Sequence, residues 1–197
     1  MAVSGVILAG GRGERLGGQD KAAVILAGRM LLEHVCERIA PLMDEMVLVL
    51  RPGQTPAALS QPPGCGVRVT HDLPGYSGVL AAMAAGLEAI ENEWAFLVAC
   101  DMPFVQLPLV RYMLAIRERW DIVVPRQEVG LEPLHALYHR RCLPALYEAL
   151  RQNRRRVIHF YEGLRVRYIE PAEIARYDPQ GLSIFNINTP EDLETAR

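Results

Sequence analysis

Short continuous apolar runs alternate with amphipathic stretches along this chain, and this alternation constrains its fold more than any other feature. Residues 46–50 and 94–99 are apolar without a break, as strands covered on both faces are, whereas a strand with one solvated face alternates. Before the first of these runs, residues 30–43 carry apolar side chains at helical spacing. Alternating strands and helices of this kind form a mostly parallel sheet with helices on both faces.

The same pattern continues over the rest of the chain. Further strands are predicted at residues 3–8, 67–69, 121–124 and 165–169, and further helices at 77–91, 107–119 and 142–152. Residues 131–138 are also strand-like, but Pro133 cannot donate to a ladder, so we expect an edge or irregular strand there. Thr189 predicts the N-cap of a last helix. No repeat or linker divides the chain, so we expect a Rossmann-like three-layer α/β/α fold in a single domain over residues 1–197.

Composition narrows the class of protein. Half of the residues are apolar, 22% are charged and the net charge is −2, which fits a sizeable core and argues against a general binder of nucleic acid or anionic membranes. The uncharged stretch 73–87 is too short to span a bilayer. The four cysteines form no CxxC pair. We therefore expect reduced thiols, with Cys36 and Cys100 in the core, in a cytoplasmic protein without nucleic-acid or membrane partners.

A glycine-rich loop follows the first strand. Residues 8–21 read Leu-Ala-Gly-Gly-Arg-Gly-Glu-Arg-Leu-Gly-Gly-Gln-Asp-Lys and end on Lys21, the only lysine among 21 basic residues. Backbone N–H groups of such a loop can surround phosphate oxygens, and the ammonium group is a compact point charge suited to one of them. The loop predicts a polyphosphate site with Arg15 and Lys21 as its cations.

Two familiar phosphate loops do not match this one. Gly13 and Gly18 have the spacing of a Walker A motif, but Gln19 stands where lysine is required. A dinucleotide-binding fingerprint starting at Gly11 fails because Leu16 replaces its last glycine. The loop is therefore neither of these, and a phosphate loop of another kind and an ordinary turn both stay open.

Asp101 follows the buried run 94–99, where the carboxyl end of a central strand should lie. Ligands of open α/β sheets bind at such ends, so Asp101 could face the same crevice as the glycine-rich loop. The sequence alone leaves two roles open for Asp101, which can be a ligand of a divalent metal or the cap of the following helix.

Other polar groups are less specific. His135 and His139 are four apart, but Pro133 argues against a helix and no HExxH pattern is complete. We expect no zinc site there, and expect His135 to lie near a substrate pocket. The run 154–156 of three arginines could be a solvated helix start or a phosphate contact.

Several motifs in order along the chain resemble the pyrophosphorylase type of nucleotidyltransferase, and most closely the molybdenum cofactor guanylyltransferases. These motifs are Leu-Ala-Gly-Gly at 8–11, Gly-Gly-Gln-Asp-Lys at 17–21, Asp72 before 74–78, Cys-Asp-Met-Pro-Phe at 100–104, Arg-Arg-Val at 155–157 and Phe-Asn-Ile-Asn-Thr-Pro-Glu-Asp-Leu at 185–193.

This resemblance implies transfer of GMP from GTP to molybdopterin, with Mg²⁺ as cofactor and pyrophosphate as the leaving group. It implies a catalytic set of Arg15, Lys21 and Asp101, with Asp101 as the metal ligand. The implied nucleotide contacts are Leu8, Ala9, Gly10, Gly11, Arg15, Lys21, Asp72 and Asp101. The implied acceptor contacts are Arg156, Asn186 and Asn188. Molybdoenzymes or cofactor-delivery proteins are the protein partners that such an activity implies.

One position departs from the family pattern. Members commonly have asparagine at the end of the second strand, where this chain has Leu50, so the base preference stays open. Cytidylyl transfer to molybdopterin and nucleotidyl transfer to a sugar phosphate are alternatives. A non-catalytic, nucleotide-gated protein that binds the cofactor is a third.

Overall fold

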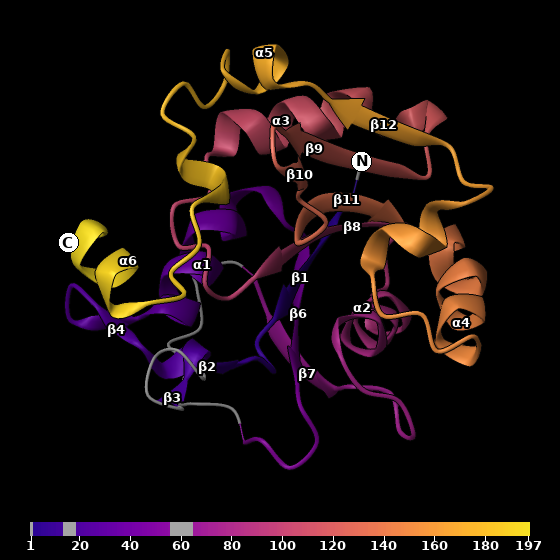
Figure 1. Cartoon of the computed structure of the whole chain (residues 1–197), viewed down its shortest axis with the longest axis horizontal. Helices are drawn as coiled ribbons and strands as arrows, with labels where there is room; N and C mark the ends of the chain where they lie inside the picture. The colour runs from indigo at the N-terminus through magenta and orange to yellow at the C-terminus, as the bar shows by residue number, and fades with distance from the viewer. Residues whose placement is uncertain (1, 14–18, 56–64) are drawn as a thin grey trace.

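The computed structural model describes residues 2–13, 19–55 and 65–197. Over that part of the chain, the largest element is a sheet of eight strands (Figure 1) in the order β10-β9-β11-β8-β1-β6-β7, with β12 pairing to β9. Its strands are β1 (Ser4–Leu8), β6 (Glu45–Leu50), β7 (Val67–His71), β8 (Trp94–Ala99), β9 (Ile122–Gln127), β10 (Gly130–Leu131), β11 (His135–His139) and β12 (Val166–Ile169). The pairs among β7, β6, β1 and β8 are parallel.

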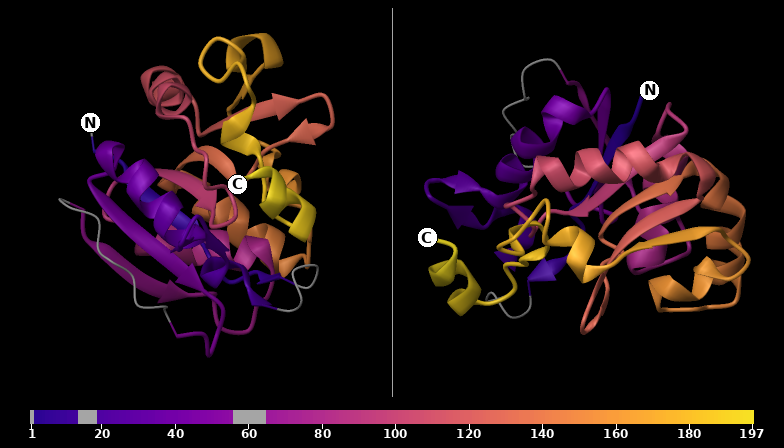
Figure 2. Two further views of the ribbon diagram at one scale, coloured as in Figure 1. Left: turned by 90° about the vertical axis from the view of Figure 1, so that its left-hand side faces the viewer. Right: turned by 90° about the horizontal axis from the view of Figure 1, so that it is seen from above.

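Helices cover both faces of the sheet, which makes three layers (Figures 1 and 2). One face carries α1 (Leu31–Ile39) and α3 (Leu107–Ile116), and the other carries α2 (Val79–Ala89) and α4 (Leu143–Arg151). The short helices are α5 (Pro171–Ile174), α6 (Pro190–Thr195), and the 3-10 turns η2 (Lys21–Ala23), η3 (Ala40–Leu42), η4 (Arg117–Arg119), η5 (Arg140–Cys142), η6 (Val157–Tyr161) and η7 (Leu182–Ile184). Two small hairpins pair β2 (Arg12–Gly13) with β3 (Gln19–Asp20) and β4 (Ile25–Leu26) with β5 (Arg29–Met30).

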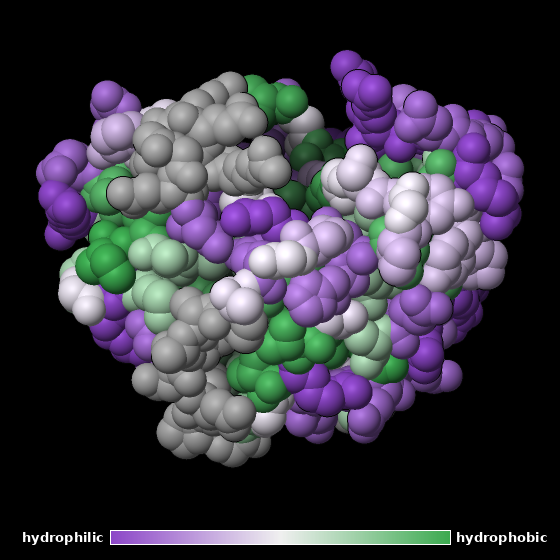
Figure 3. Space-filling view, turned by 90° about the horizontal axis from the view of Figure 1, so that it is seen from below, coloured by the Kyte–Doolittle hydropathy of each residue, from purple (hydrophilic) through white to green (hydrophobic). Residues whose placement is uncertain are grey.

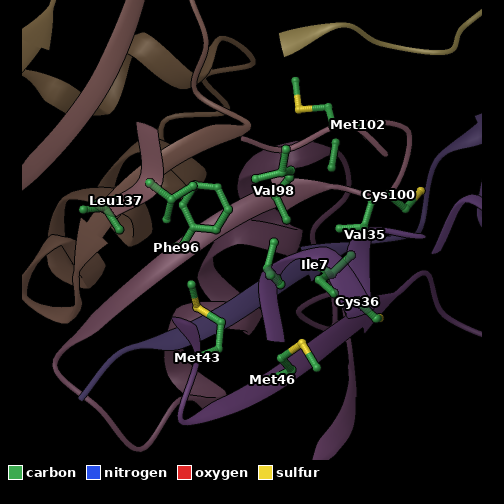
Figure 4. Packing of buried hydrophobic residues seen from close by; sticks show 14 of the residues in the cluster. Ile7, Val35, Cys36, Met43, Met46, Phe96, Val98, Cys100, Met102 and Leu137 are labelled. Carbon is green, nitrogen blue, oxygen red and sulfur yellow. The ribbon is translucent and has the colours of Figure 1, made fainter. Parts of the chain in front are cut away.

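The core lies on both faces of the central strands because β6 from Met46 onward and all of β8 carry apolar side chains in every position. Figure 4 shows the cluster on the α1 and α3 face, where Ile7, Met46 and Phe96 point from three neighbouring strands toward the helices. The next residues along the same strands, such as Val47 and Leu97, pack under α2 and α4 instead. The predicted double-sided burial is thereby confirmed, and the α/β class with it.

Helix α2 approaches the sheet through a glycine. A Cβ atom on Gly86 would lie 2.5 Å from Val6 Cγ1 and 3.1 Å from Val49 Cγ2. Both distances are shorter than an ordinary carbon–carbon contact. The absence of a side chain at Gly86 therefore sets how closely α2 lies against β1 and β6.

The prediction for residues 131–138 is wrong in one respect. Strand β11 is internal, since it pairs antiparallel with β8 on one side and with β9 on the other. Pro133 lies before the strand, and its carbonyl accepts a hydrogen bond from the Tyr138 hydroxyl. Proline at that position removes no ladder donor, so it does not force the strand to the edge.

The remaining expectations concern the cysteines, the last helix and membrane segments. All four cysteines are free and buried, and Cys36 and Cys100 lie in the core as expected. Thr189 caps α6, and its side chain accepts a hydrogen bond from the Asp192 N–H. Within the described ranges, no helix has the length and apolar character needed to cross a membrane.

Candidate active site

The carboxyl ends of β1, β6 and β8 open into a cavity of about 620 Å³. On the side seen from below, the molecular surface is hollowed and hydrophobic atoms are visible at the floor of the hollow (Figure 3). The predicted nucleotide contacts that line the cavity are Leu8, Gly10, Gly11, Lys21, Asp72 and Asp101. Segments far apart in sequence thus meet where an open α/β sheet binds its ligand.

The centre of this site is a contact between Lys21, Asp101 and Asn188. Lys21 Nζ lies 2.6 Å from Asp101 Oδ2 and 2.5 Å from Asn188 Oδ1. The side chains of Lys21 and Asp101 are only 18% and 10% exposed, so solvent screens this ion pair less than it would screen a surface pair. One ammonium group therefore joins the glycine-rich loop, the end of β8 and the C-terminal segment.

Backbone hydrogen bonds fix the C-terminal part of this contact. The Ile187 N–H donates to the Asp101 carbonyl over 2.9 Å, which places the next residue, Asn188, beside Lys21. The Asp192 carboxylate accepts from the N–H groups of Asn188 and Thr189, and these bonds lower the pKa of Asp192. The start of α6 therefore orients Asn188 before any ligand binds.

The first strand delivers the glycine-rich loop close to β6. The Ala9 N–H donates to the Val49 carbonyl over 2.9 Å, and Ala9 is fully buried. A Cβ atom on Gly10 would lie 3.0 Å from the Arg51 nitrogen, so a side chain there would push the loop away from β6. Arg15 lies outside the described residues, and its role stays a prediction.

Asp101 has a carboxylate oxygen that can coordinate a divalent metal. Its Oδ1 atom is buried and has no hydrogen-bond partner within the described residues. Those residues contain no cluster of three or more His, Cys, Asp or Glu side chains that could enclose a metal. Mg²⁺ commonly binds through one or two carboxylates together with substrate phosphates, so a single carboxylate beside a phosphate loop fits this ion.

The lining of the cavity includes two further charged residues, Asp72 and Arg51. Asp72 Oδ1 and Arg51 Nη1 are both buried without a partner in the part of the chain that the structure describes. Burial raises the pKa of Asp72. Leu50 is 1% exposed and faces the core, so Arg51 is the residue that β6 presents to the cavity. Arg51 is not among the site residues that the sequence predicts, because the family position falls on Leu50.

A second cavity, of about 480 Å³, adjoins the first. Tyr76, Ser77, Gly78 and Val79 line both cavities. Arg154 and Arg155 line the second one, whereas Arg156 is exposed and precedes η6. Asn186 is half-buried, and its amide donates to the Ile184 carbonyl. The structure therefore brings Asn188 to the site, and it places Asn186 and Arg156 outside the residues that line these cavities.

His135 and His139 lie on strand β11 rather than on a helix. The His135 ring is fully buried, with its centroid 5.0 Å from that of Phe96, and burial lowers its pKa to about 3. His139 Nδ1 accepts a hydrogen bond from the Arg141 N–H. The His135 ring packs in the core against Phe96 and lines neither cavity of the described structure, whereas Leu134 before it lines the first, so the expectation that His135 lies near a substrate pocket stays a prediction.

Comparison with known proteins decides the family. Residues 5–166 match the family model described as the MobA-like NTP transferase domain. The chain belongs to this family. A molybdenum cofactor guanylyltransferase of Desulfosudis oleivorans is 38% identical over 99% of this chain and 94% of its own length. The enzyme of that name from Vibrio cholerae is 31% identical over 96% of this chain and 89% of its own length.

Solved structures of MobA-like and related proteins share the fold. Molybdopterin-guanine dinucleotide biosynthesis protein A of Archaeoglobus fulgidus superposes with a TM-score of 0.80 and 28% identity, covering 98% of this chain and 96% of that one. The 2-C-methyl-D-erythritol 4-phosphate cytidylyltransferase of Thermus thermophilus superposes with a TM-score of 0.73 at 22% identity, covering 100% and 97% of the two chains. The protein is thus a nucleotidyltransferase with the three-layer fold of its family.

Proposed function

We propose that this MobA-like protein transfers GMP from GTP to molybdopterin, releases pyrophosphate and so forms the guanine dinucleotide form of the cofactor. The observation that supports this proposal most directly is the Lys21–Asp101–Asn188 contact at the mouth of a nucleotide-sized cavity. Relatives named molybdenum cofactor guanylyltransferase, similar over nearly the whole chain, favour this acceptor and this base.

The reaction requires little covalent work from the protein. A terminal phosphate oxygen of molybdopterin forms a bond to the α-phosphorus of GTP, and the bond from that phosphorus to the α–β bridging oxygen breaks. Pyrophosphate leaves with the electron pair of the broken bond. Catalysis then depends on alignment of two anions and on stabilisation of charge on their oxygens.

Each part of the site has a role in that alignment. The backbone of residues 8–11 holds the base and phosphates, with Arg15 and Lys21 as the cations that bind the triphosphate. Asp101 would hold Mg²⁺, which neutralises charge on the phosphate oxygens when bound. Lys21 lies 2.6 Å from Asp101 Oδ2, so the ammonium group and the metal ligand act on the same phosphates.

The acceptor is proposed to bind in the second cavity. Residues 76–79 line both cavities, so ligands bound in the two cavities would lie next to each other along this segment. Arg154 and Arg155 offer guanidinium groups suited to a phosphate of the acceptor. Asn188, which contacts Lys21, is proposed as a further acceptor contact. Arg156 and Asn186 stay proposals for acceptor contacts outside that lining.

The cavity wall also favours a guanine base. Arg51 presents a buried guanidinium nitrogen with no partner in the described structure, and guanine carries two adjacent acceptors, O6 and N7, that an arginine can bind together. Asp72, across the same cavity, is proposed to contact the nucleotide as well. A single domain over residues 1–197, a cytoplasmic location, and molybdoenzymes or cofactor-delivery proteins as recipients belong to the same proposal.

The test is pyrophosphate release from GTP in the presence of Mg²⁺ and molybdopterin. Wild type should release pyrophosphate, and Lys21→Ala should lower kcat by about 100-fold, because loss of one charge-stabilising donor costs that much in comparable sites. A wild type no faster than Lys21→Ala would overturn the proposal.

A nucleotide panel separates the alternatives. GTP should raise Tm more than CTP, ATP or UTP at equal concentration, because stabilisation follows RT ln(1 + [L]/Kd). A larger shift with CTP would indicate cytidylyl transfer. Strong GTP binding without turnover would indicate a nucleotide-gated binding protein.

A further inference from the structure

Gln54 is a largely buried amide that follows Arg51, a residue of the nucleotide cavity, by three positions. It follows the turn after β6 and is only 9% exposed. Its Oε1 accepts a hydrogen bond from the Arg51 N–H over 3.1 Å. Its Nε2 donates to the Ala9 carbonyl over 3.1 Å and to Asp20 Oδ2 over 2.5 Å. One buried amide thus ties the end of β6 to both ends of the glycine-rich loop.

The bond to Asp20 matters because Asp20 is the residue before Lys21. Asp20 Oδ1 accepts from the Ala22 N–H and caps the turn η2, whose first residue is Lys21. With Oδ2 held by Gln54, both carboxylate oxygens of Asp20 are engaged. Lys21 instead pairs with Asp101, which lies 80 residues further along the chain.

Asp20 is a second carboxylate, adjacent in sequence to Lys21, and its hydrogen bonds to Gln54 and to the Ala22 N–H engage both of its oxygens. If the amide were absent, Asp20 could turn toward Lys21 and neutralise it. A free Asp20 carboxylate could also face the incoming triphosphate, and two like charges at close range oppose binding. Neither outcome would unfold the sheet, because Asp20 and Gln54 lie outside its strands.

We propose that Gln54 is a positioning residue, which keeps the Asp20 carboxylate away from Lys21 and so directs the ammonium group toward the nucleotide phosphates. This inference rests on the proposed function, since it assigns Lys21 to the triphosphate. Gln54 acts through Asp20 and η2 rather than by touching the phosphates. Its effect should therefore be strongest on triphosphate affinity and on kcat.

Gln54→Glu tests the inference with an exchange of one NH₂ group for oxygen. The variant places a second carboxylate against Asp20, so the affinity for a GTP analogue with a non-hydrolysable α–β link, measured by calorimetry with Mg²⁺, should fall about 10- to 100-fold. Adding Asp20→Asn reverses the donor and acceptor, because the new amide can donate to the new carboxylate. Because the Ala9 carbonyl still lacks the donor that Gln54 gave it, the double variant should recover part of the lost affinity rather than all of it.

Two further variants complete the experiment. Gln152→Glu is the matched control, because Gln152 also donates its Nε2 to a carboxylate, Glu148, over 2.6 Å, but lies exposed at the end of α4. It should leave nucleotide affinity unchanged. Gln54→Met removes the donor without adding charge and should also weaken binding, which keeps the test valid if Gln54→Glu does not fold.

The outcomes separate this inference from the proposed function. If Gln54→Glu and Gln54→Met bind the analogue as wild type does, or if Asp20→Asn does not rescue Gln54→Glu, Gln54 is not a positioning residue. If wild type binds the analogue but releases no pyrophosphate from GTP and molybdopterin, the proposed reaction fails, and the affinity series still decides the role of Gln54. A wild type that binds no triphosphate overturns both.

Discussion

Replacement of Gly86 by alanine should destabilise the protein, although Gly86 lies inside helix α2, where alanine is normally the better residue. The gain in helix propensity is about 1 kcal/mol. Against it, the new methyl group would lie 2.5 Å from Val6 Cγ1, about 1 Å inside the usual carbon–carbon contact distance. Val6 is completely buried, so it has little room to move.

Overpacking of this kind costs about 1–3 kcal/mol. We take about 2.5 kcal/mol, since α2 is held against both β1 and β6, and expect a net loss of about 1.5 kcal/mol in the free energy of unfolding. For a chain of this size, that loss lowers Tm by about 3–6 °C. Urea and thermal unfolding followed by circular dichroism measure both quantities.

A double-mutant cycle identifies the cause. Val6→Ala alone should cost about 2 kcal/mol, as loss of buried methyl groups does. In that background the 2.5 Å contact is gone but the 3.1 Å contact with Val49 Cγ2 stays, so Gly86→Ala should cost nothing or stabilise by up to about 1 kcal/mol, which corresponds to a coupling energy of about −1.5 to −2.5 kcal/mol. A Gly86→Ala variant with raised Tm, or additive effects of the two substitutions, would refute the reasoning.

Three further predictions concern charged and polar groups. Burial raises the pKa of Asp72 in the folded state, so the free energy of unfolding falls as the pH rises through that pKa. Asp72→Asn should therefore raise Tm at pH 7 but not below about pH 3.5. The same variant should weaken GTP binding in calorimetry. Hydrogen bonds from Arg165 lower the pKa of Asp121, so the ionised Asp121 stabilises the fold above about pH 4. Asp121→Asn should lower the free energy of unfolding by about 2 kcal/mol at pH 7. If this loss did not shrink in unfolding curves measured in acid, the ion pair would not be its cause. Asn188→Ala should lower kcat for pyrophosphate release about tenfold, because Lys21 keeps Asp101 but loses its second partner; an unchanged kcat would exclude a role for this contact in turnover.

The fold could be predicted from local patterns because its central strands are apolar on both sides. Residues 94–99 form β8 as expected, and Thr189 caps the last helix. A proline within a strand-like run normally indicates an edge or an irregular strand, which is what residues 131–138 predict. Only the pairing partners show that Pro133 precedes the strand and that β11 is inserted between β8 and β9.

The site could be predicted in part. Strand ends and a glycine-rich loop were enough to bring Lys21 and Asp101 into one cavity. Arg51 and Gln54 were missed because neither belongs to a motif. Their importance comes from the way the chain turns after β6, which orients Leu50 into the core and Arg51 outward. The sequence could not separate Asn186 from Asn188 either, since the Ile187–Asp101 backbone bond decides which side chain meets Lys21.

The C-terminal segment has a consequence for how the protein opens. Its apolar anchor is a cluster separate from the two cores of the sheet, in which Ile187 packs with Val24, Leu26 and Leu31 and is joined by partly buried residues that include Leu193 and Ala196. Because α6 itself has no buried residue, this segment can detach while the sheet stays intact. Amide hydrogen exchange at Ile187 and Asn188 should therefore be faster than in β8. Each such detachment would withdraw Asn188 from Lys21, so the lifetime of the assembled site is set by this local opening rather than by global unfolding.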